Sequence, residues 1–74
     1  MKQLDLHHTR HNLVQPKLIR FIEDNWNQDI DAEIITGNSD EMKKLVKDIL
    51  DEYKLYYREG SFDGVNKGFL RVWI

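Results

Sequence analysis

The feature that most constrains the fold is an amphipathic segment near the middle of the chain, which has the pattern of an α-helix. Its apolar residues recur at spacings of three and four, and charged residues fill the opposite face. The apolar stripe consists of Met42, Leu45, Val46, Ile49, Leu50 and Tyr53. On the other face, Lys43, Lys44 and Lys47 alternate with acids, which is typical of a solvated surface. The stripe must pack against the rest of the chain.

Strand patterns flank this helix on both sides. Strands are predicted at residues 3–7, 33–36, 55–59 and 68–74, with a loop at 60–64. A second helix is predicted between the first two strands, on a stripe formed by Val14, Leu18, Phe21, Ile22 and Trp26. Because proline is tolerated only in the first helical turn, Pro16 places the start of this helix near Leu13 or later, and Asn27 should end it.

This order of elements, β-α-β-α-β-β, predicts an α/β two-layer sandwich with a four-stranded mixed sheet and both helices on one face. The 74 residues contain no repeat, linker or low-complexity segment, so the expected domain is residues 1–74. The chain is 41% hydrophobic and has no cysteine, so packing of the helices on the sheet must stabilise it without disulfides or zinc–thiolate sites.

Charge and hydropathy exclude some classes of protein. A net charge of −2 argues against a strongly cationic protein that coats DNA. No leader with a basic and an apolar region precedes the first predicted strand, and no run of about 18 apolar residues could span a bilayer. The expectation is a cytoplasmic protein with no membrane partner.

The first two predicted strands carry the candidate catalytic residues. In the first, Leu4 and Leu6 alternate with Asp5 and His7, and parallel pairing would bring the ends of both strands to one edge. His7 can act as an acid or a base near neutral pH, and Asp5 could orient that imidazole or hold a cation. In the alternative reading, Asp5 accepts hydrogen bonds from backbone amides of the next turn and His7 is a polar residue at a strand end.

Two further groups of residues could bind a ligand or simply stabilise the fold. His7, His8 and His11 form a cluster in the sequence, but neighbouring strand residues point to opposite faces, so a solvated loop is favoured over a metal site. At the start of the second helix, Gly37, Asn38 and Ser39 offer an anion site. The alternative is ordinary capping by Asn38 or Ser39, and Asn38 with Glu41 suggests a capping box.

The last predicted strand has a strict alternation. Phe69, Arg71 and Trp73 fall on the sheet face away from the helices, and Lys67 and Arg58 could extend this surface. Aromatic side chains beside cations are the usual platform for single-stranded nucleic acid. A protein partner or a homodimer interface would use the same surface.

The residues at the strand ends resemble those of the Smr (small MutS-related) domain family. Its members open with a strand reading Leu-Asp-Leu-His followed by glycine, and Leu4-Asp5-Leu6-His7 matches the first four positions. A later strand ends in His-Gly-x-Gly or Thr-Gly-x-Gly before the second helix, and Thr36-Gly37-Asn38-Ser39 occupies that place. The sequence departs from the pattern at His8 and Ser39, which stand at glycine positions, and at Pro16 in the first helix.

The resemblance implies a fold similar to the C-terminal domain of translation initiation factor three. It also implies an endonuclease that cleaves or nicks RNA, less often DNA, with Asp5 and His7 as catalytic residues. Thr36, Gly37, Asn38 and Ser39 would join the sheet face in binding nucleic acid. Whether Mg²⁺ or Mn²⁺ is a cofactor stays open, and no residue is assigned to a metal.

Two functional hypotheses follow from these patterns. The first is a domain that binds nucleic acid, with RNA favoured over DNA, and cleaves it through Asp5 and His7. The second is a non-catalytic module that docks on RNA or on a protein partner through the sheet face and the helix start. A purely structural or dimerising domain is the third alternative.

Overall fold

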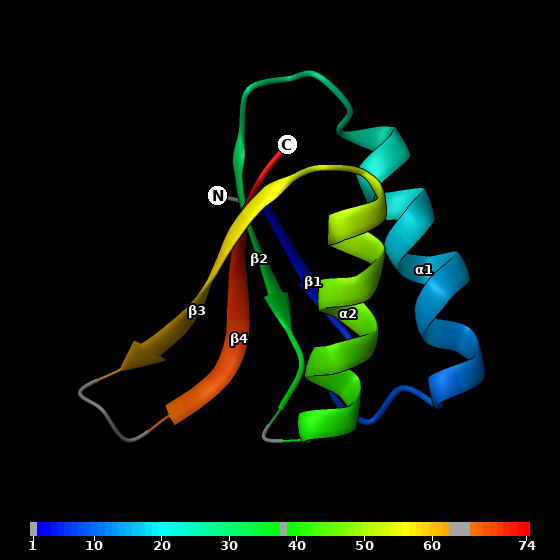
Figure 1. Ribbon diagram of the computed structural model, residues 1–74, viewed down its shortest axis with the longest axis vertical. Coiled ribbons are helices and arrows are strands. Elements are labelled where there is room, and N and C mark those ends of the chain that lie inside the picture. Colours follow the sequence, from blue (N-terminus) through cyan, green and yellow to red (C-terminus); the bar gives the residue numbers. More distant parts are fainter. Residues whose placement is uncertain (1, 38, 63–65) are drawn as a thin grey trace.

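The computed structural model has its helices and strands in the predicted order, β-α-β-α-β-β (Figure 1). It describes residues 2–37, 39–62 and 66–74, without the side chains at 61, 62, 66 and 67. The elements are β1 (Lys2–Asp5), α1 (His11–Asp24), β2 (Asp31–Ile35), α2 (Asp40–Glu52), β3 (Tyr56–Phe62) and β4 (Asn66–Trp73). Both helices pack on one face of a four-stranded mixed sheet, which confirms the predicted two-layer sandwich.

The strand order in the sheet is β1-β2-β4-β3. β1 pairs with β2 in parallel, and β4 pairs antiparallel with both β2 and β3. The last strand of the sequence is therefore inserted between β2 and β3. Because those two strands both run antiparallel to β4, they are parallel to each other, as two crossovers followed by a hairpin require.

The hydrophobic core lies between the helices and one face of the sheet. Residues from both helices and from β2 and β4 meet there, together with Leu6 just after β1. The buried apolar residues are Leu6, Val14, Leu18, Ile22, Ala32, Ile34, Met42, Val46, Ile49, Leu50, Leu70 and Val72. The alternation in β2 and β4 thus places every second side chain in the core and leaves the others on the opposite face.

Helix α1 begins earlier than predicted. It starts at His11 and continues through Pro16, which contradicts the expected start near Leu13. The N–H of Leu13 donates to the carbonyl of Arg10 at 2.9 Å, so a tighter i→i+3 bond closes the first turn. Pro16 has no N–H to offer the carbonyl of Asn12, but Asn12 is exposed, so water can satisfy that carbonyl.

Helix α1 also ends earlier than predicted, at Asp24 rather than near residue 27. The side chain of Asn25 is buried, and its Nδ2 donates to the carbonyl of Phe21 at 2.8 Å, which satisfies one of the last carbonyls of the helix. Trp26 therefore lies beyond the helical stripe. Its ring packs edge-on against Tyr53 with centroids 6.0 Å apart, and the side chain is 51% exposed.

Strand β3 is longer than predicted. It continues through residues 60–62, which were expected in a loop, whereas residues 63–65 of that loop lie outside the described part of the chain. Gly60 suggested a break because glycine weakens a strand. The strand continues because the ring of Phe69 on β4 covers Gly60 so closely that a Cβ there would overlap it. The register then shifts between Gly60 and Phe62.

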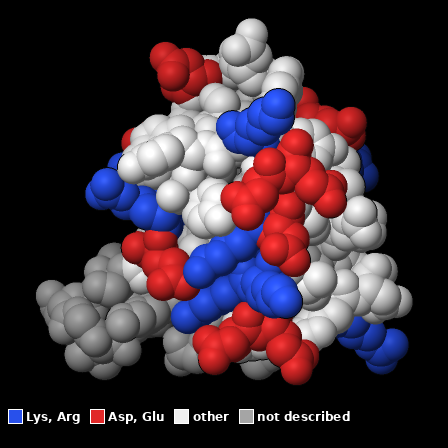
Figure 2. Space-filling view, viewed as in Figure 1, with Lys and Arg blue, Asp and Glu red and all other residues white. Residues whose placement is uncertain are grey.

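Polar contacts join the outer side of α2 to β3. Lys47 Nζ donates to Glu59 Oε1 at 2.7 Å, and this hydrogen bond raises the pKa of Lys47 above its ordinary value. The hydroxyl of Tyr57 donates to Asp51 Oδ1 at 3.0 Å; burial, and then this hydrogen bond, raise the pKa of Tyr57. Figure 2 shows positive and negative side chains intermixed over the region of α2. This arrangement agrees with the predicted solvated face.

Helix α2 ends in a Schellman motif. The N–H of Lys54 donates to the carbonyl of Asp51 at 3.0 Å, and that of Leu55 to the carbonyl of Leu50 at 3.0 Å. Lys54 has φ +57°, the left-handed conformation that glycine usually supplies at this position. The chain therefore keeps a strained residue where a helix normally ends in glycine.

Replacing Lys54 with glycine is expected to raise the free energy of unfolding by about 0.5–1 kcal/mol, because relief of the left-handed strain exceeds the entropy cost of glycine. Urea unfolding followed by circular dichroism measures the change. Lys54→Ala is the matched control, since it removes the long side chain but keeps the Cβ. An equal gain in the alanine variant would show that the side chain, not the backbone, was responsible.

Neither α1, with 14 residues, nor α2, with 13, is long and apolar enough to cross a membrane, and no other helix occurs in the described residues.

Candidate functional site

The turn after β1 contains both residues predicted to be catalytic. Asp5 accepts a hydrogen bond through Oδ1 from the backbone N–H of His7 at 3.0 Å. The N–H of Thr9 donates to the carbonyl of Leu6 at 2.9 Å and closes a four-residue turn. His8, its third residue, has φ +66°, so the turn is of type II, which favours glycine at this position. Asp5 thus has the backbone role that was its alternative reading.

Directly after β2, two backbone N–H groups share one carbonyl acceptor on β4. The N–H groups of Thr36 and Gly37 both donate to the carbonyl of Gly68, at 2.8 and 2.9 Å. Thr36 is only 3% exposed, and its hydroxyl lies 2.9 Å from the Gly37 carbonyl oxygen and 3.2 Å from that of Gly68. The Thr36 hydroxyl and the Gly37 N–H therefore both have hydrogen-bond partners within the protein.

The two sequence motifs meet through His7 and Gly37. Parallel pairing of β1 with β2 sets Asp5 beside Ile35, so the two strand ends share one edge, as predicted. Gly37 has φ +73°, and an ideal Cβ built on it would lie 3.2 Å from His7 Cδ2. The edge of the imidazole therefore packs directly against the glycine. We refer to this contact as the His7–Gly37 edge.

The start of α2 is capped by Ser39. Its hydroxyl accepts a hydrogen bond from the N–H of Met42 at 3.2 Å. Of the two expected caps, Ser39 is confirmed, and the capping box of Asn38 with Glu41 is wrong because the cap lies one residue later in the chain; Asn38 itself is outside the described residues. Asp40 and Glu41 occupy the first turn and complement the positive end of the helix dipole. This local chemistry favours capping over anion binding.

The three histidines separate into two groups. The rings of His7 and His8 lie side by side with centroids 3.6 Å apart, whereas His11 Nδ1 lies 3.7 Å from Glu41 Oε2 on α2. In the part of the chain that the structure describes, no three His, Asp or Glu side chains are arranged to hold a metal ion. The reactive groups at the His7–Gly37 edge are thus two adjacent imidazoles and the Asp5 carboxylate.

The sheet face away from the helices, here called the open face, carries the predicted residues of the last strand. Its residues are Gln3, Asp5, Asp31, Glu33, Ile35, Tyr56, Arg58, Gly60, Phe69, Arg71 and Trp73. The register sets Phe69 opposite Ile35, and Ile35 opposite Asp5. Because neighbouring strands are about 4.8 Å apart, Phe69 and Asp5 are about 10 Å apart in one row. The aliphatic Ile35 thus lies between the aromatic Phe69 and the predicted catalytic carboxylate.

Arg71, Trp73 and Tyr56 form a stack on the open face. Arg71 Cζ lies 5.7 Å from the centroid of the Trp73 ring, and Arg71 Nη2 donates to Asp31 Oδ2 at 2.9 Å. The Trp73 ring packs against Tyr56 with centroids 5.0 Å apart. Tyr56, which is 62% exposed, is a site residue that the sequence reasoning missed. Its alternation with Arg58 in the third strand was the signal that could have identified it.

Charge divides the open face into two halves. The half formed by β1 and β2 carries the acids Asp5, Asp31 and Glu33, and Gln3 Nε2 donates to Glu33 Oε2 at 3.1 Å. The half formed by β3 and β4 carries the cations Arg58 and Arg71. Lys67 lies in β4, but its side chain is outside the described residues. A polyanion would therefore be attracted to β3 and β4 and repelled by β1 and β2.

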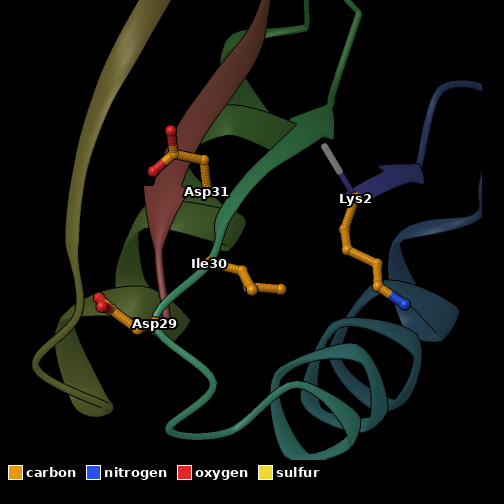
Figure 3. Close-up of a pocket in the computed structure, with 4 residues that line it drawn as sticks. All are labelled: Lys2, Asp29, Ile30 and Asp31. Carbon is orange, nitrogen blue, oxygen red and sulfur yellow. The ribbon is translucent and has the colours of Figure 1, made fainter.

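A surface hollow lies at the other end of the sheet from the His7–Gly37 edge. It is lined by Lys2, Asp29, Ile30 and Asp31 (Figure 3). The Asp31 side chain extends toward β4, whereas the Lys2 side chain extends toward α1 (Figure 3). The hollow contains none of the residues predicted from the sequence motifs, and its Asp31 is already paired with Arg71.

Comparison with known proteins identifies no relative of this chain. No family model matches this sequence, and searches of curated proteins and of solved structures find no significant match. The resemblance to Smr domains therefore stays a prediction from the two motifs. The His7–Gly37 edge and the open face are the features from which a function can be proposed.

Proposed function

We propose that this domain binds single-stranded RNA on the β3–β4 half of the open face. The observation that carries the proposal is the stack of Arg71 over Trp73, at 5.7 Å, with Tyr56 against the same indole, at 5.0 Å. Aromatic rings bind unpaired bases by stacking, and neighbouring guanidinium groups bind the phosphate backbone. Phe69, one row closer to the His7–Gly37 edge, extends the stacking surface toward that edge.

A single strand suits this surface better than a duplex. A sheet with exposed aromatic rings can stack only on bases that are not already paired, whereas the bases of a duplex are inaccessible to it. RNA is preferred to DNA because of the resemblance to Smr domains, several of which act on messenger RNA. The net charge of −2 fits a local contact on one half of one face, not a coating of the nucleic acid.

Replacing Trp73 with alanine is expected to weaken the binding of a labelled single-stranded oligoribonucleotide. A stacked base is worth about 1–3 kcal/mol, so the affinity should fall by about 5- to 150-fold in fluorescence anisotropy. Trp26→Ala is the matched control, because this tryptophan is 51% exposed and packs on Tyr53 in the helix layer. Equal affinities for the two variants would contradict the assignment of the binding face.

The dependence of affinity on salt separates RNA from a protein partner. Each phosphate contact with a single strand should contribute about −0.7 to the slope of log affinity against log salt. A steep slope for the wild-type protein, together with a shallower slope for Arg71→Met, supports RNA binding. No RNA binding together with a self-associating protein in analytical ultracentrifugation would favour the alternative of a homodimer on the same face.

A second candidate function, cleavage of the bound RNA, is favoured by the two adjacent imidazoles at the His7–Gly37 edge. In this reaction, His7 takes the proton of a ribose 2′-hydroxyl, whose oxygen forms a bond to the neighbouring phosphorus. The bond from phosphorus to the 5′-oxygen breaks, and His8 or water gives that oxygen a proton. The products are a 2′,3′-cyclic phosphate and a 5′-hydroxyl. Asp5 holds the turn in place by accepting the His7 N–H.

Cleavage is tested with labelled single-stranded RNA, single-stranded DNA and duplex DNA, each in EDTA and in Mg²⁺ or Mn²⁺. The expected result is cutting of RNA alone in EDTA, reduced at least about 100-fold in the Asp5→Ala/His7→Ala double variant. His11→Ala is the control, since this histidine lies on α1 beside Glu41. Cutting by the double variant at the wild-type rate would leave a binding domain without catalysis.

A further inference from the structure

Two arginines face each other at the centre of the β3–β4 half of the open face. The register sets Arg58 directly opposite Arg71, so their Cβ atoms are about 5 Å apart on the same face. Like charges directly opposite each other destabilise a sheet. Within the described part of the chain, Asp31 beside Arg71 is the one carboxylate in ion-pair contact with either guanidinium. Among the described residues, one carboxylate in ion-pair contact thus serves two guanidinium groups.

Both guanidinium groups reach toward the same pair of rings. Arg58 Nη2 lies 3.4 Å from the hydroxyl oxygen of Tyr56, and Arg71 Cζ lies 5.7 Å from the centroid of the Trp73 ring. The two rings are themselves in contact, with centroids 5.0 Å apart. Each arginine thus contacts one residue of the Tyr56–Trp73 ring pair.

We propose that Arg58 and Arg71 together bind one phosphate group beside the Tyr56–Trp73 ring pair, and that Asp31 holds Arg71 until the phosphate displaces it. An anion between two guanidinium groups offsets their repulsion, and the planar fork of each arginine matches phosphate oxygens. The Asp31 carboxylate presents similar oxygens to Arg71 at 2.9 Å, which makes it an internal competitor for the same position. This proposal rests on the proposed function in one respect only, namely that the bound phosphate belongs to RNA.

The neighbouring charges limit where the rest of a polyanion can lie. Glu33 stands opposite Arg71 on β2, and the Gln3 amide holds its carboxylate at 3.1 Å on the β1 side. Asp5 adds a second carboxylate further along β1. A backbone that places one phosphate between the two arginines must therefore continue along β3 and β4, and it reaches the His7–Gly37 edge at the Gly68 end of β4.

The site can be tested with inorganic phosphate, titrated against chloride at constant ionic strength. Nuclear magnetic resonance of the arginine Nε–H and tryptophan indole signals reports binding at Arg58, Arg71 and Trp73. Arg58→Met should weaken phosphate binding about tenfold or more, and Asp31→Asn should tighten it about two- to fivefold by removing the competitor. Arg20→Met on α1 is the matched control, because Arg20 pairs with Asp24 away from the sheet face.

Thermal unfolding without phosphate distinguishes a phosphate-binding arginine from an arginine that only stabilises the fold. Because Arg58 repels Arg71 when no anion is bound, Arg58→Met should raise the melting temperature by about 1–5 °C while it weakens phosphate binding. A lower melting temperature, or phosphate binding unchanged by Arg58→Met, would overturn the proposal. The same variants are then tested with the labelled oligoribonucleotide.

The two proposals fail in different ways. RNA binding that depends on Trp73 but is unaffected by Arg58→Met overturns the arginine site and leaves the proposed function standing. Phosphate binding that requires Arg58, without any RNA binding, supports the arginine site and removes RNA as its source of phosphate. Tighter binding of both probes by Asp31→Asn supports the site and its link to RNA together.

Discussion

Replacing Leu50 with alanine is expected to lower the free energy of unfolding by about 2–5 kcal/mol. The Leu50 side chain is fully buried in the core between α2 and the sheet, and alanine would leave a cavity there. A domain of this size has a total stability of about 4–11 kcal/mol, so the variant would be partly unfolded at moderate temperature. Urea unfolding should show a lower midpoint with an unchanged slope.

Leu13→Ala is the matched control for this experiment. It makes the same chemical change on α1, but Leu13 is 44% exposed, so the loss should stay below about 1 kcal/mol. Similar losses for the two variants would show that the core does not lie where the structure places it. The Schellman bond from the Leu55 N–H to the Leu50 carbonyl uses the backbone, so neither substitution removes it.

Replacing Gly37 with alanine is expected to cost about 2 kcal/mol and to move the His7 ring. The left-handed φ of +73° costs an L-residue about 1–2 kcal/mol, and the new Cβ would be 3.2 Å from His7 Cδ2. Urea unfolding measures the cost, and the chemical shifts of the His7 ring protons report the displacement. Any RNA cleavage should fall with the displacement.

Two further variants separate the two contributions at Gly37. In a His7→Ala background the contact with the ring is gone, so Gly37→Ala should cost only the backbone part. Asparagine tolerates the left-handed conformation better than alanine, so Gly37→Asn should cost less than Gly37→Ala although its side chain is larger. An alanine variant as stable as the wild type would contradict the close packing of His7 on Gly37.

Features that depend on local spacing could be predicted from the sequence. The stripe of α2 is read from a period of about 3.6, and Met42, Val46, Ile49 and Leu50 are buried as that period requires. The alternation in β4 is equally local, since a strand turns successive side chains to opposite faces. The meeting of Asp5 and Thr36 at one edge followed from a single assumption, that β1 and β2 are parallel.

Features that depend on contacts between distant residues could not be predicted in this way. β3 continues past Gly60 because the ring of Phe69 on β4 covers that glycine. Thr36 is buried where the carbonyl of Gly68 accepts a hydrogen bond from its N–H and lies 3.2 Å from its hydroxyl. The exposed Tyr56 became part of the site only through its register with Trp73. The contacts of Gly60 and Thr36 leave no periodic trace in the sequence, and the alternation of Tyr56 with Arg58 does not identify Trp73 as its partner.

The position of β4 has a consequence for how the chain folds. β1, α1 and β2 form a parallel unit that precedes β3 and β4 in the chain, so the pairing of β1 with β2 does not require the last strand. Before the final strand enters between them, β2 lacks its second hydrogen-bonded neighbour and β3 lacks any strand neighbour in the described sheet. The sheet is thus completed at its centre by the strand that follows the other three in the chain. Until β4 is made, the gap between β2 and β3 stays open and the open face cannot form.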